Sequence, residues 1–146
     1  MDQIDIDIGS LGELFEAHAK LRTIFLQFAG HAGTFMQQQS EVRGVTVERH
    51  DAQDRFLCRY FGKVLECRFL FDAISGKPQG GIEFSRLRSE SPALRTRVAS
   101  LLFSDEGEVI ESDPPLSIQL NILKPRQALA VLVHALKLGM TSEALR

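Results

Sequence analysis

The residues of this 146-residue chain that could do chemistry are two cysteines, four histidines and a set of bases in which arginine predominates. Cys58 and Cys67 stand symmetrically about Gly62-Lys63. Paired thiols can form a disulfide, carry redox chemistry or bind a metal. A zinc site needs about four ligands, and no histidine or further cysteine stands at a matching spacing. We therefore expect no metal site and two buried, reduced thiols, with a cross-strand disulfide as the alternative.

The cysteines belong to two runs of alternating apolar residues, at positions 56–61 and 64–71. Glycine in the first place of a two-residue loop suits a type II′ hairpin turn. With that turn the register pairs Cys58 with Cys67 and Arg59 with Glu66. One face of this predicted hairpin is almost wholly apolar and is expected to be core, and it holds Phe56, Cys58, Tyr60, Leu65, Cys67, Phe69 and Phe71.

The arginines are the second candidate for chemistry, because a planar guanidinium is favoured at anion sites and at protein interfaces. Arg55, Arg59 and Arg68 share the outer face of the hairpin with apolar side chains. A face of arginine, aromatic and aliphatic residues has the composition of an interface. The alternative is a solvated strand face that binds nothing. The candidate binding residues are Arg55, Arg59, Phe61, Arg68, Lys77 and Arg86.

The turn-rich segment 72–81, DAISGKPQGG, raises another possibility. Gly76, Gly80 and Gly81 together with Lys77 could offer backbone amides and a cation to an anion. A small-ligand or nucleotide sensor that uses the Arg face and this loop is therefore the second functional hypothesis.

Motifs for catalysis are missing from the sequence. It contains no nucleophile elbow, dinucleotide fingerprint, phosphate-binding loop or HExxH zinc motif. His18 and His134 fall on apolar helix faces and are expected to pack, whereas His31 and His50 are expected to be solvated. The sequence thus favours a non-enzymatic protein without a cofactor, although an enzyme whose residues converge only in space remains an alternative.

Composition narrows the class of protein further. The net charge is −2, which speaks against nucleic acid as a partner. The charge is uneven, with −3 over residues 1–40, +3 over 41–104 and −2 over 105–146. The acidic start does not resemble a secretory signal, and no apolar run could span a membrane. We expect a cytoplasmic protein with no membrane partner.

The expected elements position these residues in one α+β domain over residues 1–146. Alternation of isoleucine and aspartate predicts an edge strand at 4–8, and the Ser10–Glu13 capping box predicts a helix that ends near Gly30 and Gly33. Ser91-Pro92 predicts a helix over about 92–103, with a hairpin into residues 109–110 as the rival. Further strands are expected at 45–48, 82–88, 109–110 and 116–122, and a helix from Pro125 to Gly139.

The predicted fold is an antiparallel meander sheet of about five to six strands with an N-terminal and a C-terminal helix packed on it. The element order resembles that of small acidic secretion chaperones, and this resemblance implies a dimer that holds extended clients. We expect a protein-binding module of the adaptor, secretion-chaperone-like or immunity/antitoxin-like kind. Because the last helix is apolar nearly all round, it could supply a homodimer seam, at Leu129, Leu132, Val133 and Leu136.

Overall fold

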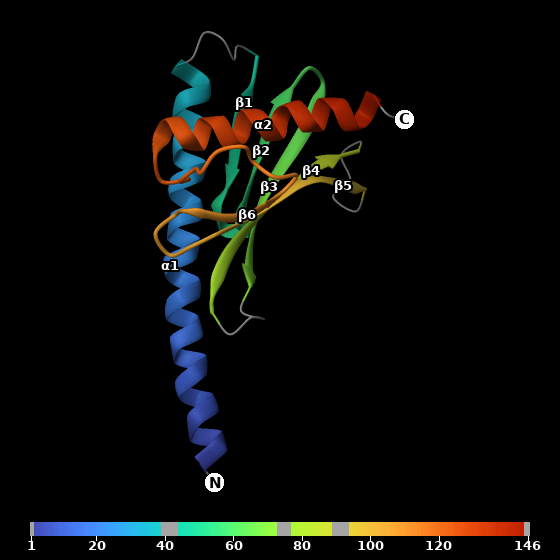
Figure 1. Ribbon diagram of the computed structural model, residues 1–146. Coiled ribbons are helices and arrows are strands. Elements are labelled where there is room, and N and C mark those ends of the chain that lie inside the picture. Colours follow the sequence, from blue (N-terminus) through green and yellow to red (C-terminus); the bar gives the residue numbers. More distant parts are fainter. Residues whose placement is uncertain (1, 39–43, 73–76, 89–93, 145–146) are drawn as a thin grey trace.

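The computed structural model describes residues 2–38, 44–72, 77–88 and 94–144. Six strands form one antiparallel sheet in the order β1-β2-β3-β4-β5-β6, so every strand pairs with its neighbour in the sequence. This is the predicted α+β meander with a helix at each end of the chain (Figure 1). The elements are α1 (Asp2–Gln38), β1 (Thr46–His50), the short 3-10 helix η2 (Asp51–Gln53), β2 (Arg55–Tyr60), β3 (Lys63–Asp72), β4 (Gln79–Leu87), β5 (Arg95–Phe103), β6 (Val109–Asp113) and α2 (Pro125–Ala144).

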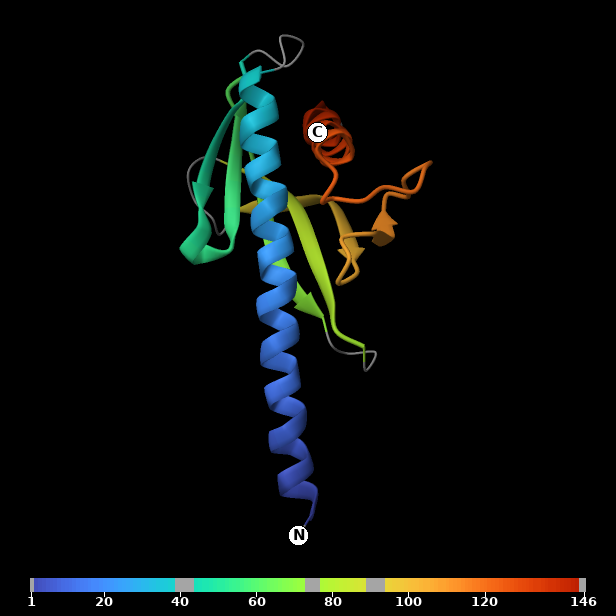
Figure 2. The ribbon, with the colours of Figure 1, turned by 90° about the vertical axis from the view of Figure 1, so that its left-hand side faces the viewer.

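Both helices share one hydrophobic core with alternate side chains of the sheet. This inner face carries aromatic residues of α1 and of the strands, with the rings of Phe25 and Phe56 5.9 Å apart and those of Phe25 and Phe69 5.7 Å apart. α2 crosses α1 near its C-terminal end and lies over β4 and β5 (Figures 1 and 2). We call the opposite side of the sheet the outer face. The core residues of α1 and α2 pack with side chains of the inner face.

The β2–β3 hairpin confirms the predicted faces but corrects the predicted register. Its two loop residues are Phe61 and Gly62, with φ of 49° and 72°, so the turn lies one residue earlier than expected. Positive φ at both positions is the requirement of a type I′ turn. Cys58 therefore pairs with Leu65, not with Cys67. Moving a hairpin turn by one residue shifts each partner by two, and a shift of two leaves every side chain on its original face.

Residues 2–38 form one continuous helix, so the strand predicted at 4–8 is wrong. A strand needs a paired neighbour, and this part of α1 runs past the end of the sheet (Figures 1 and 2). The helix also continues through Gly30 and Gly33, where it was expected to end. At Gly30 the Arg49 guanidinium lies against the helix and its Nη2 donates to the carbonyl of Leu26 at 3.3 Å. No helix in the described part of the chain is long and apolar enough to cross a membrane.

The helix expected over 92–103 is a strand, β5, and the rival hairpin is the structure observed. The turn into β6 is closed by hydrogen bonds from Ser104 N to Glu108 O and from Gly107 N to Ser104 O, both 2.9 Å. The helical spacing of apolar residues was coincidental, because pairing with β4 buries Leu101 and Phe103 at alternate positions. Ser91-Pro92, the expected helix start, lies outside the described residues.

The segment 116–122 is not the strand that its alternation predicts. Among its residues only Asn121 forms a β-bridge, with Glu108. Pro114 and Pro115 precede it, and proline has no amide proton to give to a ladder. The segment instead covers the edge of β6, where Val109 N donates to Leu120 O at 2.9 Å. α2 begins at Pro125 as predicted but continues beyond Gly139 to Ala144.

Candidate functional site

The outer face is built around a buried carboxylate. Glu66 on β3 is 1% exposed, and its Oε2 accepts hydrogen bonds from Arg55 Nη1 at 2.8 Å and Arg95 Nη2 at 3.2 Å. Arg95 Nε also lies 3.0 Å from Glu66 Oε1. Burying a carboxylate is costly unless it is paired, and the two guanidiniums that contact Glu66 offset this cost and link β2, β3 and β5.

Most of the arginines predicted to bind a partner are occupied within the chain. Arg55 is paired with Glu66, and Arg68 donates from Nη2 to Glu83 Oε1 at 2.8 Å. Arg59 pairs across to Glu48 of β1 at 3.8 Å, in place of the expected pair with Glu66. His50 also contacts this carboxylate at 2.6 Å, and this hydrogen bond, followed by the charge of Arg59, lowers the pKa of Glu48.

Arg86 lies on the other side of the sheet from these arginines. It pairs with Leu65 on the inner face, is buried there, and donates from Nη1 to the carbonyl of Gly139 at 3.0 Å. Its role in the described structure is to tie α2 to β4. The structure thus brings Arg55, Arg59 and Arg68 to one face, as predicted, and separates Arg86 from them.

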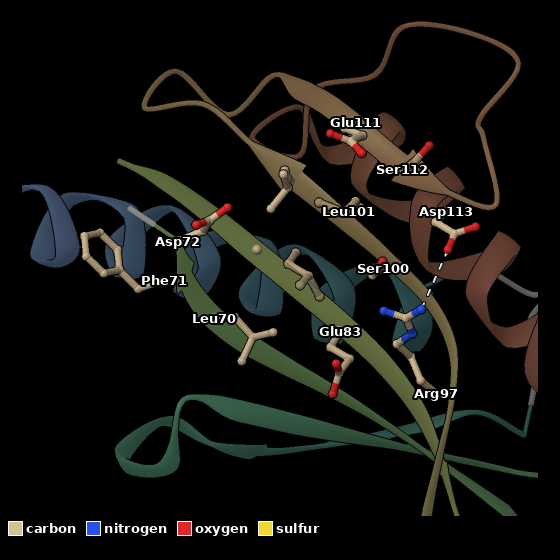
Figure 3. Close-up of a pocket in the computed structure, with 13 residues that line it drawn as sticks. Leu70, Phe71, Asp72, Glu83, Arg97, Ser100, Leu101, Glu111, Ser112 and Asp113 are labelled. Atoms are coloured by element: carbon tan, nitrogen blue, oxygen red, sulfur yellow. Dashed lines mark ion pairs between the residues drawn. The ribbon is translucent and has the colours of Figure 1, made fainter. Parts of the chain in front are cut away.

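A groove of about 470 Å³ is hollowed in the outer face where β3, β4, β5 and β6 lie side by side (Figure 3). Apolar side chains form much of its surface, with Leu70 exposed at one side. Serine hydroxyls and carboxylates are interspersed among them, and β6 is the edge strand that borders it. The lining residues are Leu70, Phe71, Asp72, Gly81, Ile82, Glu83, Arg97, Ser100, Leu101, Leu102, Glu111, Ser112 and Asp113.

The groove is acidic. Four of its lining residues are carboxylates and one is a base, Arg97. Arg97 lies 3.7 Å from Asp113, and both side chains are more than half exposed, so solvent screens this pair (Figure 3). Glu83 is paired with Arg68. The groove therefore combines apolar contact area with an excess of negative charge, which suits an occupant with apolar and cationic groups.

The described residues of the segment 72–81 lie in different places rather than at one anion site. Lys77 lines a separate hollow of about 160 Å³ against α1, together with Lys20. Gly80 is buried under the ring of Phe103, where a Cβ would come within 2.2 Å of the ring. Gly81 lines the groove, and Gly76 lies outside the described residues. Gly80 is thus explained by packing rather than by anion binding.

Phe61, the remaining predicted binding residue, projects from the tip of the β2–β3 hairpin. It is 75% exposed, and its φ of 49° is strained for a residue with a Cβ. Strain of this kind is tolerated where the surroundings or a function require it. The structure places Phe61 beyond the groove, because it is not among the groove's lining residues.

The two thiols and His18 pack against other side chains of the described structure. Cys58 and Cys67 are free and buried, and burial raises the pKa of the Cys67 thiol well above its ordinary value. His18 packs edge-on against Phe69 and Phe71, at centroid distances of 5.5 and 5.3 Å. Among the described residues, no cluster of three metal-ligating side chains exists.

The residues predicted for a dimer seam divide into two pairs. Leu132 and Leu136 of α2 are buried within the chain's own core, whereas Leu129 and Val133 are half-buried. Of these four residues, Leu129 and Val133 are therefore the two that keep surface for a partner.

Sequence reasoning missed the acidic side of the groove. Glu111 and Asp113 reach it because β6 pairs with β5, and β5 was expected to be a helix. The alternation of β5 residues beside the turn 104–107 was the signal that could have found it. Comparison of the chain with models of known families, with curated proteins and with solved structures finds no match.

Proposed function

We propose that this protein is a non-enzymatic protein-binding module, of the adaptor or secretion-chaperone kind, whose outer-face groove receives an extended client segment rich in apolar and basic side chains. The observation that carries the proposal is the groove of about 470 Å³, with its apolar surface and its excess of carboxylates. It differs from the Arg-centred interface expected from the sequence, because the arginines of that face are largely paired with internal carboxylates.

The shape of the groove supports an extended occupant. It lies across four neighbouring strands and is bordered by the edge strand β6, so a segment laid along it would contact alternate side chains of several strands. Leu70 and Leu102 supply apolar contacts, and desolvation of such contacts is the main source of binding free energy.

The charges of the groove support a cationic occupant. Glu111 and Asp113 are both exposed, and of these two only Asp113 has a lining base beside it, Arg97. Carboxylates at the rim of a site attract bases and repel acids, which affects specificity and association rate more than final affinity. An acidic or polyanionic partner is disfavoured for the same reason.

A panel of short peptides, labelled for fluorescence anisotropy, tests the proposal. Peptides that alternate apolar residues with Lys or Arg should bind, and peptides of the same apolar content with Asp or Glu should not. Leu70→Asn should raise Kd about tenfold, which corresponds to about 1.4 kcal/mol, because it removes an apolar contact without adding charge. Leu94→Asn is the matched control, because Leu94 is also an exposed leucine and does not line the groove. Equal binding of both peptide classes, or no binding by any peptide, contradicts the proposal.

A small cationic ligand is the second candidate, because the volume of the groove lies within the range of small-molecule sites. Thermal stabilisation by polyamines without any peptide binding would favour it over a client segment.

A further inference from the structure

Near its N-terminal end, α1 carries apolar side chains that the described part of the chain leaves largely exposed. We call residues 2–17 the α1 arm. Leu11 is 50% exposed and Phe15 66% exposed, whereas Leu21, two turns further on, is buried in the core. His18, the residue after the arm, packs on Phe69 and Phe71 of β3. Figures 1 and 2 both show α1 running on past the sheet, so the arm projects from the body of the protein.

A projecting amphipathic helix gains stability from a partner. In proteins most of a helix's stability comes from packing its apolar face rather than from helix propensity. The spacing that buries the C-terminal half of α1 also continues through the arm, because in the sequence Ile4 and Ile8 precede Leu11 and Phe15 at intervals of three or four. The arm therefore carries an apolar stripe of the kind that packs against another helix.

Charge identifies the surface that fits the arm. Residues 2–19 carry five acids and no lysine or arginine. The exposed side of α2 is the opposite, because residues 124–141 contain three lysines or arginines and no acid. Residues that are exposed or half-buried recur along this side every three to four positions, and some of them are apolar. This row consists of Arg126, Ala130, Val133, Lys137 and Met140. An apolar, basic helix face thus complements an apolar, acidic one.

The two complementary surfaces cannot meet within one chain. α2 crosses the end of α1 that lies farthest from the arm (Figures 1 and 2). Two other contacts are disfavoured: arm against arm would oppose like charges, and the exposed side of the C-terminal half of α1 is polar, with Thr23 and Gln27. We propose that the α1 arm of one copy docks on the exposed side of α2 in a second copy. Reciprocal exchange of the two arms closes a two-fold dimer.

Light scattering after size exclusion, at high micromolar concentration, tests the proposal on the full chain. The wild type should be a dimer, and Phe15→Glu should be a monomer, because it puts an acid into the apolar stripe. Ile118→Glu is the matched control, since Ile118 is also 66% exposed but lies outside both surfaces, and it should stay dimeric. Circular dichroism checks that each variant is folded.

A charge exchange between two variants separates docking from general loss of solubility. One variant carries Glu13→Lys and Glu16→Lys in the arm, and the other carries Arg126→Glu and Lys137→Glu in α2. Each alone should be monomeric, because like charges then meet at both contacts. The mixture should form a heterodimer, because both contacts become attractive again. A monomeric wild type, a dimer that Phe15→Glu leaves intact, or a mixture that stays monomeric overturns the proposal. Because no groove residue is altered, these outcomes are independent of peptide binding.

Discussion

Tyr60 of β2 and Gly139 of α2 are in such close contact that a Cβ at residue 139 would lie 2.5 Å from the Tyr60 phenol oxygen. The same phenol donates a hydrogen bond to the carbonyl of Leu136 at 2.8 Å. Gly139 was expected to end its helix, and the structure gives it another role. It lets a buried tyrosine reach the backbone of α2 and so fixes the position of this helix on the sheet.

Gly139→Ala is expected to destabilise the protein, although alanine is the better helix former by about 1 kcal/mol. The clash with the Tyr60 hydroxyl outweighs that preference because both groups are buried. Tyr60→Phe alone should cost about 1 kcal/mol through the lost hydrogen bond. In the double variant the clash is smaller, so the two losses should be less than additive. Urea unfolding of the four proteins measures the coupling, and strict additivity would contradict the contact.

Glu66→Gln is expected to lower the free energy of unfolding by about 1.5–3 kcal/mol, because it removes the carboxylate that Arg55 and Arg95 share. Glu48→Gln serves as the control: its carboxylate is exposed, so the variant should change stability very little. Chemical denaturation measures both. A loss at Glu66 no larger than that at Glu48 would show that the buried network does not stabilise the fold.

The buried Cys67 thiol predicts a dependence of stability on alkaline pH. Its pKa is raised in the folded protein by burial and then by the adjacent Cys58, so folding favours the protonated thiol. This contribution is fully present below the ordinary thiol pKa of about 8.5 and is lost as the pH rises towards the folded pKa. Between pH 8 and pH 10 the free energy of unfolding should therefore fall more steeply with pH for the wild type than for Cys67→Ala. Equal slopes would contradict it.

The same burial predicts that the two thiols do not react in the folded state. A thiol reagent at neutral pH should label neither Cys58 nor Cys67 until denaturant is added, because the thiolate is the reactive form and both sulfurs are inaccessible. Rapid labelling of the native protein would contradict the inward orientation of the β2–β3 hairpin.

Phe61→Asn is expected to stabilise the protein by about 0.5–1 kcal/mol. Asparagine before Gly62 is the favoured pair for a type I′ turn, and the exposed ring gives up little packing when it is removed. Thermal unfolding measures the gain. If the variant is more stable but binds client peptides less well, Phe61 is an anchor for which the turn tolerates strain; if it is less stable, the turn assignment is contradicted.

The candidate site was harder to predict than the fold. Alternation along the hairpin correctly placed Phe56, Cys58 and Cys67 in the core. This assignment held although the turn was misplaced, because a register shift of two residues leaves every side chain on the same face. The groove depends on β5, where the helical and strand patterns both fit the apolar residues 94–102. Only pairing with β4 decides between them, and the period of residues 94–102 by itself does not reveal that pairing.

The sequence by itself determined the α+β class, the apolar side of the hairpin and the start of α2, because each follows from a local period or a capping residue. The tertiary structure alone decided that α1 continues through Gly30, that Glu66 gathers Arg55 and Arg95, and that Lys77 lies apart from the arginines. A glycine costs a helix about 1 kcal/mol, which packing against the sheet readily exceeds. The partner of a charge depends on which strands become neighbours, and that is a property of the whole fold.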